Sequence, residues 1–396
     1  MMPSGWELVP ASTVCEAVID CKNRTPPFVE KSEFAVVRTP NVRNGRFVCN
    51  ELKYTDEDSF KIWTQRGVPT AGDVLITREA PLGEVCLVPP QMKVCLGQRM
   101  MLYRPDQKKI KSEYLLQALM SEDVQKRLKR GSDGSTVGHA KVGQIRDLLI
   151  LLPPKAEQEK IAKILSTWDE AIEKLEAYFI KRRQLLAHQV EVIYSQIKKD
   201  GKEADLKGVC SYIQDGTHST PNYTKEGIPF YSVETLVSND FNKTKYISRK
   251  DHEINIKRCR PEKGDLLLTR IGSLGVSKLI DWDIEASIYV SLALLKPNLD
   301  LVDSAYLYFY FQTREFNREL LKRSLLNAAP QKINLSEIGN IPVWLPKNEA
   351  TQEAAGKYVM EMKAEVELLK KRIDKLKLQK QGLMQQLLMG KKRVKV

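Results

Sequence analysis

The sequence predicts an α+β protein made of two tandem copies of one unit, each a mixed, strand-rich domain followed by a long helix. Residues 72–83 and 264–275 carry nearly the same sequence, 192 positions apart. The stretches 155–199 and 348–389 have the apolar spacing of long helices that pack on another helix. Between these features, short apolar runs bounded by Gly and Pro are typical of strands.

The internal repeat is the strongest of these signals. Residues 72–83 read Gly-Asp-Val-Leu-Ile-Thr-Arg-Glu-Ala-Pro-Leu-Gly, and residues 264–275 read Gly-Asp-Leu-Leu-Leu-Thr-Arg-Ile-Gly-Ser-Leu-Gly. Nearly the same spacing aligns further pairs: Asp20 with Asp215, Tyr54 with Tyr246, Arg66 with Arg258, Pro105 with Pro297, and Gln158-Glu159 with Gln352-Glu353. Chance similarity does not hold one spacing over so many positions.

Each copy begins with a globular domain. Val74–Ile76 and Val85–Val88 are expected as strands around a tight loop, and Met100–Tyr103 as a further strand. One helix is expected over 112–129, and its counterpart over 303–322. A small polar loop follows each helix, and a strand then leads into Leu-Pro and the long helix. The domain boundaries follow from the repeat: 1–153 and 201–346 are the two domains, 154–200 is the central long helix, and 347–396 is the C-terminal long helix with a basic tail.

The two long helices each carry one apolar seam. The stretch 155–199 contains neither Pro nor Gly, and Pro153-Pro154 precede it. The seam residues are Ile161, Leu165, Trp168, Ile172 and Leu175 in the first helix, and Val359, Met362, Val366, Leu369 and Ile373 in the second. Arg182, Gln189 and Gln196 take seam positions in the second half of the first helix. The helices are expected to pair with each other; the alternative is that each lies on its neighbouring domain as an ordinary amphipathic helix.

Composition narrows the class of protein. The formal net charge of +13 suits a polyanionic partner, most often nucleic acid, although a merely basic soluble protein has the same charge. No apolar run is long enough for a membrane span, and the N-terminus lacks the regions of a signal peptide. The seven cysteines are scattered and the four histidines lie far apart. This pattern favours a reducing cytoplasm and predicts no metal site.

A duplicated basic domain suggests recognition of two similar targets, and two DNA half-sites are the natural candidate. Base edges are read by Arg, Lys, Asn, Gln, Ser and Thr on loops of a rigid scaffold. The candidates are Arg43, Asn44, Arg46, Thr77, Arg78, Arg99, Lys129, Arg130 and Ser135 in the first copy, and Thr217, His218, Lys243, Lys245, Thr269, Arg270, Arg323, Gln331 and Lys332 in the second. A solvated surface charge is the alternative for each, and a structural salt bridge for the repeated Thr-Arg pairs.

Motifs of catalysis are missing from the sequence. It contains no Gly-x-x-x-x-Gly-Lys-Ser/Thr phosphate loop, no Asn-Pro-Pro-Tyr or Asp-Pro-Pro-Tyr stretch, and no Gly-rich loop in the arrangement of a cofactor-binding sheet. No catalytic residue, metal ligand or cofactor is therefore assigned to this chain.

The ordered set of motifs resembles the specificity subunit of type I restriction-modification systems over the whole chain. The motifs are the two Gly-Asp segments, Asp215-Gly216-Thr217-His218-Ser219-Thr220-Pro221, the two Leu-Pro entries followed by Gln-Glu, and the ending Gln381–Gly390. The first copy departs from the pattern at Cys21–Pro26, where Gly-Thr-His is lost.

The resemblance implies a fold and a role. Each domain would be a target recognition domain that reads half of a bipartite double-stranded DNA sequence. The helices would form an antiparallel coiled coil with pseudo-two-fold symmetry and dock two methyltransferase subunits, which bind S-adenosylmethionine and modify adenine. Nuclease and translocase subunits would join for restriction, leaving this chain a non-catalytic, cytoplasmic reader. The alternatives are the reader of another DNA modification system, a DNA-modifying enzyme with an unrecognised active site, and a structural coiled-coil scaffold.

Overall fold

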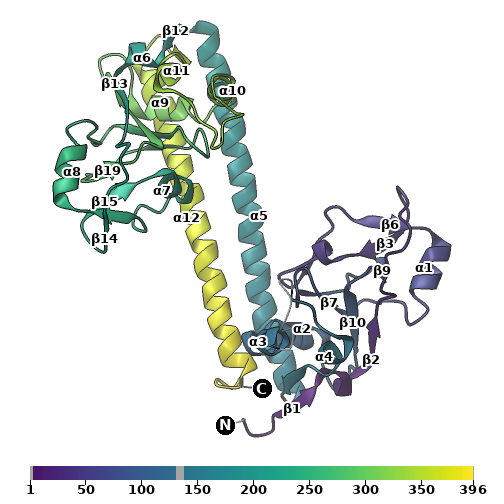
Figure 1. The fold of residues 1–396 in the computed structure, drawn as a ribbon. Coiled ribbons are helices and arrows are strands. Elements are labelled where there is room, and N and C mark those ends of the chain that lie inside the picture. Colours follow the sequence, from purple (N-terminus) through teal and green to yellow (C-terminus); the bar gives the residue numbers. More distant parts are fainter. Residues whose placement is uncertain (1–2, 131–137, 396) are drawn as a thin grey trace. The chain divides into compact units, whose positions relative to one another are not determined.

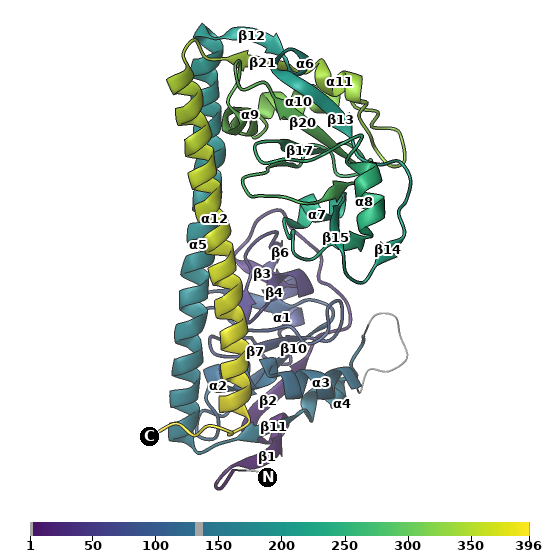
Figure 2. The ribbon, with the colours of Figure 1, turned by 90° about the vertical axis from the view of Figure 1, so that its left-hand side faces the viewer.

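The computed structural model describes residues 3–130 and 138–395. Internal contacts divide the chain into two compact units. Unit 1 combines the residues up to Glu176 with those from Arg372 onward, and unit 2 comprises Ala177–Lys371. Figures 1 and 2 show the elements of both. The predicted position of Ser135 lies outside the described residues.

The two long helices are α5, Lys155–Asp200, and α12, Glu349–Leu388, and each contributes a part to both units. The other elements of unit 1 are β1 (Glu7–Pro10), η1 (Ala11–Val14), β2 (Cys15–Asp20), β3 (Phe34–Val37), η2 (Thr39–Asn41), β4 (Val42–Arg43), β5 (Arg46–Phe47), β6 (Lys53–Thr55), α1 (Glu57–Trp63), β7 (Val74–Thr77), β8 (Val85–Leu87), β9 (Lys93–Leu96), β10 (Met100–Pro105), α2 (Ser112–Met120), α3 (Glu122–Arg130), α4 (Val142–Arg146) and β11 (Leu149–Leu152).

Unit 2 contains β12 (Lys202–Asp205), α6 (Leu206–Val209), β13 (Cys210–Asp215), β14 (Tyr223–Thr224), β15 (Ile228–Tyr231), α7 (Val233–Ser238), β16 (Lys245–Ile247), α8 (Arg249–Asn255), β17 (Leu266–Thr269), β18 (Ser277–Leu279), β19 (Ser287–Ile288), β20 (Leu292–Pro297), α9 (Ser304–Tyr310), α10 (Arg314–Lys322), α11 (Leu335–Gly339) and β21 (Pro342–Leu345).

The sequence repeat is a repeat of topology. The main sheet has the strand order β2-β10-β7-β8 in unit 1 and β13-β20-β17-β18 in unit 2, and all its neighbours are antiparallel. The strand before the long helix pairs with the first strand of the unit, as β1-β11 and β12-β21. A second sheet has one parallel pair in each unit, β3 with β9 and β15 with β19. The predicted α+β class and the duplication are therefore confirmed.

The units differ after the first strand of the second sheet. Unit 1 places the β4–β5 hairpin there, whereas unit 2 places helix α7. This is the stretch in which the two copies also diverge in sequence.

The expected single helices are each broken in two. The prediction over 112–129 is wrong at Ser121, whose extended backbone separates α2 from α3, and the prediction over 303–322 is wrong around Thr313. Each hydroxyl caps the second helix: Ser121 Oγ accepts the backbone N–H of Val124 at 3.4 Å, and Thr313 Oγ1 accepts that of Phe316 at 3.1 Å. Each cap satisfies one of the backbone N–H groups that a new helix start leaves without an intrahelical partner, which lowers the cost of the break.

The repeated Gln at the start of each long helix ties that helix to its domain. Gln158 Oε1 accepts the backbone N–H of Lys111 at 3.0 Å, and Gln352 Oε1 accepts that of Asp303 at 2.9 Å. Both glutamines are buried. Lys111 and Asp303 stand just before α2 and α9, so the same clamp occurs in both units.

The long helices run antiparallel within each unit. In unit 1 the start of α5, with Ile161 and Leu165, shares a core with Leu387 near the end of α12. In unit 2 the last turns of α5, with Tyr194, share a core with Val359 in the first half of α12. The antiparallel pairing implied by the resemblance is thus present in each unit.

The C-terminal tail completes unit 1. Arg393 Nε donates to Glu157 Oε2 at 2.8 Å, and Arg393 Nη1 donates to the backbone oxygen of Ser4 at 2.9 Å. Trp6 Nε1 donates to the same buried carboxylate at 3.4 Å. The residues near both ends of the chain therefore meet at the start of α5.

Candidate nucleic-acid interface

A buried carboxylate organises the loop end of the main sheet in unit 2. Asp215, the last residue of β13, accepts hydrogen bonds from Arg270 Nη1 at 2.8 Å and from Arg258 Nη2 at 2.8 Å. His218 Nε2 lies 2.9 Å from the same carboxylate. Burial lowers the pKa of Arg270, and the charge of Asp215 opposes that shift. Arg270 also donates through Nε to the backbone oxygen of Ile333 at 3.1 Å, so this cluster joins four segments of the chain.

Unit 1 repeats the centre of this cluster. Asp20, at the end of β2, accepts a hydrogen bond from Arg78 Nη1 at 3.1 Å. Arg66 Nη1 donates to the backbone oxygen of Asp20 at 3.2 Å. Asn23 stands in the place of His218, and its Oδ1 lies 3.4 Å from Arg78 Nη1. The repeated positions of Asp20, Arg66 and Arg78 in the sequence are therefore one spatial cluster.

The repeated Thr-Arg pairs lie in the interior. Thr77 and Thr269 have no exposed surface, and Arg78 and Arg270 are 9% and 8% exposed. Each threonine closes its hairpin, since Thr77 Oγ1 accepts the N–H of Glu84 at 2.9 Å and Thr269 Oγ1 accepts that of Val276 at 2.9 Å. Arg78 and Arg270 form the salt bridges that the structural alternative expects, with Asp20 and Asp215. Thr77 and Thr269 have no surface that DNA could reach.

Three of the candidate DNA-binding residues lie on the β4–β5 hairpin, and their side chains have different surroundings. Arg46 points to α5, with Nη1 2.9 Å from Glu176 Oε2. Arg43 Nη1 donates to the backbone oxygens of Thr39 and Val42 at 2.8 and 2.9 Å. Asn44 at the hairpin tip is exposed. Arg46 therefore holds the hairpin to the long helix, and Asn44 is the side chain left on the surface.

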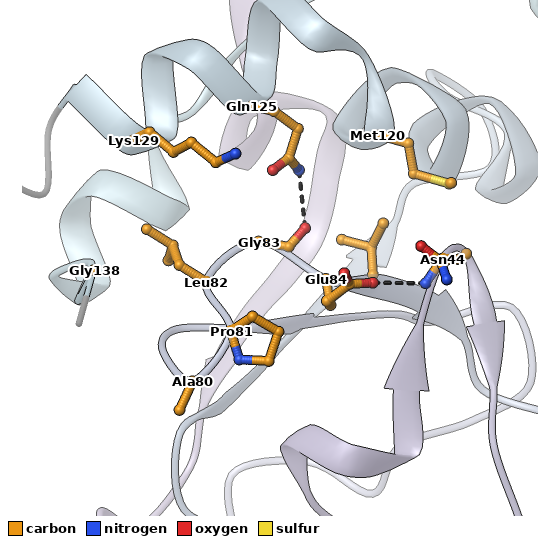
Figure 3. Close-up of a pocket in the computed structure, with 12 residues that line it drawn as sticks. Asn44, Ala80, Pro81, Leu82, Gly83, Glu84, Met120, Gln125, Lys129 and Gly138 are labelled. Atoms are coloured by element: carbon orange, nitrogen blue, oxygen red, sulfur yellow. Dashed lines mark hydrogen bonds between the residues drawn. The ribbon is translucent and has the colours of Figure 1, made fainter. Parts of the chain in front are cut away.

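A cavity of about 560 Å³ opens beside this hairpin (Figure 3). Its wall comes from the β7–β8 loop, from α2 and α3, and from Asn44, whose backbone N–H donates to Glu84 Oε2 at 2.6 Å. Gln125 Nε2 donates to the backbone oxygen of Gly83 at 2.8 Å and fixes the loop. Lys129 lines the opposite wall, so two exposed candidates from distant parts of the sequence face one hollow.

The other candidates of unit 1 lie on the surface. Arg99 is exposed, and its Nε pairs with Glu79 Oε1 at 2.7 Å. Glu79 also lies 3.2 Å from His139 Nδ1. Arg130, at the end of α3, is exposed next to residues 131–137, which lie outside the described part of the chain.

In unit 2 the exposed candidates lie on two loops and around the start of β16. His218, Lys243, Lys245, Gln331 and Lys332 are exposed. Lys245 Nζ stands 4.7 Å from the ring centroid of Tyr223. Lys332 is tied through its backbone, which bridges Ile271 and Leu325.

Two further unit 2 candidates have local partners. Arg323 is partly buried and ion-paired with Glu319 one helical turn earlier. Thr217 is partly buried, and its backbone N–H donates to Ile288 at 3.0 Å. The exposed candidates of both units stay predicted DNA-binding residues.

Unit 1 has a basic and aromatic cluster that the sequence did not predict. Lys22 Nζ and the guanidinium of Arg24 stand 5.7 and 5.4 Å from the ring centroid of Trp63. Trp63 Nε1 donates to the backbone oxygen of Arg24 at 3.0 Å. Together with Arg66, these cations lie at the end of β2. The signal in the sequence is the run Lys22-Asn23-Arg24, which replaces Gly-Thr-His and places two cations there.

The seam residues of the long helices are confirmed as interior or partly buried positions. Ile161, Leu165 and Ile172 are buried, as are Val359, Met362 and Ile373. Trp168, Leu175, Val366 and Leu369 are partly buried. The assignment of Gln196 to the seam is wrong, because it is exposed while Val190, Tyr194 and Ile197 are buried. There α5 packs on the domain of unit 2 as well as on α12; the rings of Tyr194 and Tyr310 are 5.7 Å apart.

Comparison with known proteins decides the family. The family described as the type I restriction modification DNA specificity domain matches residues 3–179 and again residues 198–378. The chain belongs to this family. Each match covers one domain with an adjoining part of a long helix, which is the repeating unit found in the sequence.

Relatives of this specificity family support the assignment along the chain. The EcoKI specificity subunit of Escherichia coli (strain K12) is 22% identical over 298 residues, which span 69% of this chain but only 63% of that protein. The putative MjaX specificity subunit of Methanocaldococcus jannaschii is 24% identical over 426 residues, covering 100% of this chain and 95% of that protein. A crystal structure of the type I S subunit from M. genitalium has the same fold, with a TM-score of 0.65 at 18% identity over 98% of this chain and 99% of the other.

The described residues contain no group of three His, Cys, Asp or Glu side chains placed to hold a metal ion. Burial raises the pKa of the thiols of Cys86 and Cys210 to about 12, so neither is a thiolate near neutral pH. No helix in the described part of the chain is long and apolar enough to cross a membrane.

Proposed function

We propose that this chain is the DNA-reading subunit of a type I restriction-modification complex, and that each unit reads one half of a bipartite double-stranded target. The observation that carries the proposal is the double match to the specificity family, one match per unit. The exposed candidates on the loops of each domain supply the side-chain types that contact bases and phosphates.

The long helices are proposed to dock two methyltransferase subunits. Ile180, Leu368 and Leu378 on these helices are 55%, 68% and 68% exposed, and a docked subunit would cover them. S-adenosylmethionine would bind to the methyltransferase subunits, and nuclease and translocase subunits would join for restriction. This chain would itself carry no catalysis. Its unpaired cysteines suit the cytoplasm, where such a complex works on DNA.

Methylome sequencing of cells with and without the gene tests the proposal. We expect methylated adenines to disappear with the gene at sites made of two short specific blocks and a fixed unspecific gap. A contiguous palindromic site would contradict reading by two different domains. If every methylated site persisted in cells without the gene, the chain would not be part of a modification complex.

Reconstitution separates reader from enzyme. The purified chain should bind DNA and transfer no methyl group until a methyltransferase subunit is added. Methyl transfer or binding of S-adenosylmethionine by the chain alone would favour the alternative of a DNA-modifying enzyme.

A further inference from the structure

We propose that Arg258 and His218 form a binding site for a phosphate of the DNA backbone, and that Asp215 is the residue that positions both. The inference rests on the proposed function and adds residues that the sequence analysis did not connect. The side chain of Asp215 is 3% exposed, whereas those of Arg258 and His218 are 50% and 62% exposed. One interior carboxylate therefore presents two nitrogen-bearing side chains to solvent.

The charge balance leaves Arg258 available for an anion. Asp215 already has a buried counter-ion in Arg270, whose side chain is 10% exposed. That pair is neutral, so the guanidinium of Arg258 adds a positive charge at the surface. A guanidinium held in one orientation is well suited to phosphate because its N–H groups form a planar fork.

The orientation of Arg258 is fixed from one edge. Its Nη2 donates to Asp215 Oδ1 at 2.8 Å. The side-chain oxygen of Gln214, once its amide faces the guanidinium, lies 3.2 Å from Nε and 2.8 Å from Nη2. The hydroxyl of Tyr212 donates to the backbone oxygen of Arg258. Among the described residues, none accepts a hydrogen bond from Nη1, so the opposite edge is open to a ligand.

The segment that carries His218 is rigid. Thr217 N donates to Ile288 O at 3.0 Å, and Val290 N donates to Thr217 O at 3.0 Å. A Cβ on Gly216 would stand 1.9 Å from Ile288 O, so the close approach of these strands requires glycine. Because the loop is held before any ligand arrives, little ordering entropy opposes binding.

Unit 1 has a different set of cations at the same place. Arg66 corresponds to Arg258, and Asn23 replaces His218. Lys22 and Arg24 on Trp63 add positive charge there. The repeated position keeps an exposed arginine beside an Asp-Arg pair while its neighbours change. This fits a contact to the uniform DNA backbone better than a contact to a base.

The test is the salt dependence of DNA binding by the full-length chain, measured by fluorescence anisotropy with a labelled duplex of mixed sequence. Each phosphate contact contributes about 0.9 to the slope of log affinity against log salt. Arg258→Ala should make that negative slope shallower by roughly one unit, and it should weaken binding about equally on different sequences. Arg258→Lys should restore the slope, since the charge returns, and His218→Asn, which copies unit 1, should weaken binding less than Arg258→Ala does.

Arg318→Ala is the matched control. Arg318 lies on α10 of the same unit, is 68% exposed and pairs with Glu315 and Glu319. This variant should keep the slope of the original chain. An unchanged slope in Arg258→Ala, with an unchanged melting temperature, would overturn the inference while leaving the proposed function intact. Failure of the unaltered chain to bind the duplex at any salt concentration would overturn both.

Asp215→Asn tests positioning. The Asp215→Asn variant should have the same shallower slope as Arg258→Ala. The double variant Asp215→Asn with Arg258→Ala should have no shallower a slope than either single variant. Its melting temperature should fall, because Arg270 loses its buried counter-ion. If the folded Asp215→Asn variant kept the slope of the original chain, the Asp215 carboxylate would not be what positions Arg258 and His218.

Discussion

Lys363 shows how a single polar side chain can be held at a helix–domain contact. Its Nζ donates to the hydroxyl of Tyr308 at 2.8 Å and to Gln312 Oε1 at 2.7 Å. Burial lowers the pKa of Lys363 from 10.5 to about 8, with a further contribution from Lys278, while Glu367 opposes the shift. The corresponding seam region of unit 1 has Asp169, bonded to Gln117 and Lys380. Polar contacts of this kind favour one register of a helix over its neighbours.

The lowered pKa predicts a pH dependence of stability. Between about pH 8 and pH 10.5 the unfolded chain binds more protons at Lys363 than the folded chain, so this residue makes the protein more stable as pH rises through that window. Lys363→Met should remove this dependence and raise stability at neutral pH by up to about 3 kcal/mol. The measurement is the melting temperature of variant and original chain between about pH 7 and pH 9.5, below the ordinary pKa of tyrosine.

Lys357→Met is the control, because Lys357 lies on the same helix with its side chain 76% exposed. Parallel melting curves across the pH range for Lys363→Met and the original chain would contradict the prediction.

At the residue scale, the sequence repeat shows which positions the two copies share, but it does not show which of these residues are in contact. Asp20, Arg66 and Arg78 recur in the second copy, and their repetition was visible. Their contact was not, because 58 residues separate Asp20 from Arg78 and periodicity carries no information on such pairs. A repeated acid with two repeated arginines was nevertheless a usable signal for a buried ion pair. The exposed cations Lys22 and Arg24 lacked any such counterpart in the other copy.

At the scale of elements, the long helices were predictable because a seam of 3 and 4 residue steps has few other interpretations. Their ends, Lys155–Asp200 and Glu349–Leu388, lie within one residue of the expected ranges. The breaks at Ser121 and Thr313 were missed, although a hydroxyl residue followed by acidic residues is a helix start signal. The shift of the seam toward Val190 and Tyr194 could not be predicted, because it depends on a domain packed from a second side.

The long helices are also expected to set the gap between the two half-sites. An insertion near Ser195 would separate Tyr194 from Ile197 in the core of unit 2, so that position is unsuitable. The boundary between the units lies after Glu176 on α5 and after Lys371 on α12. One heptad inserted at both points keeps the seam in phase and adds about 10 Å of helix. At about 3.4 Å per base-pair step, the unspecific gap should lengthen by about three base pairs.

Methylome sequencing of the double-insertion variant measures the length of the unspecific gap. Four residues inserted at the same two points turn the seam by about 40° and should abolish methylation rather than lengthen the gap, which makes them a control for register. An unaltered gap in the heptad variant would show that the helices do not set the spacing.

At the scale of the whole molecule, the two units repeat one fold around different loops, which suggests independent readers. Replacing residues 1–150 by those of a relative should change one half of the target sequence and leave the other half and the gap unchanged. The reciprocal replacement of residues 205–345 should change only the other half. Methylome sequencing of both chimaeras checks this, and a change in both halves from either exchange would contradict independent reading.

Unit 1 is built from two segments that are far apart in the sequence, and this affects how the protein folds during synthesis. The ribosome delivers all of unit 2, Ala177–Lys371, before it delivers the segment that completes unit 1. Until then, Ile161 and Leu165 lack the α12 residues that share their core, and Glu157 lacks Arg393. At about 5–20 residues per second this wait lasts at least several seconds, with apolar surface exposed. The domain that is synthesised first is therefore expected to finish folding last. A nascent chain that stalls just after Lys371 would leave unit 1 open to aggregation although every residue of unit 2 has been made.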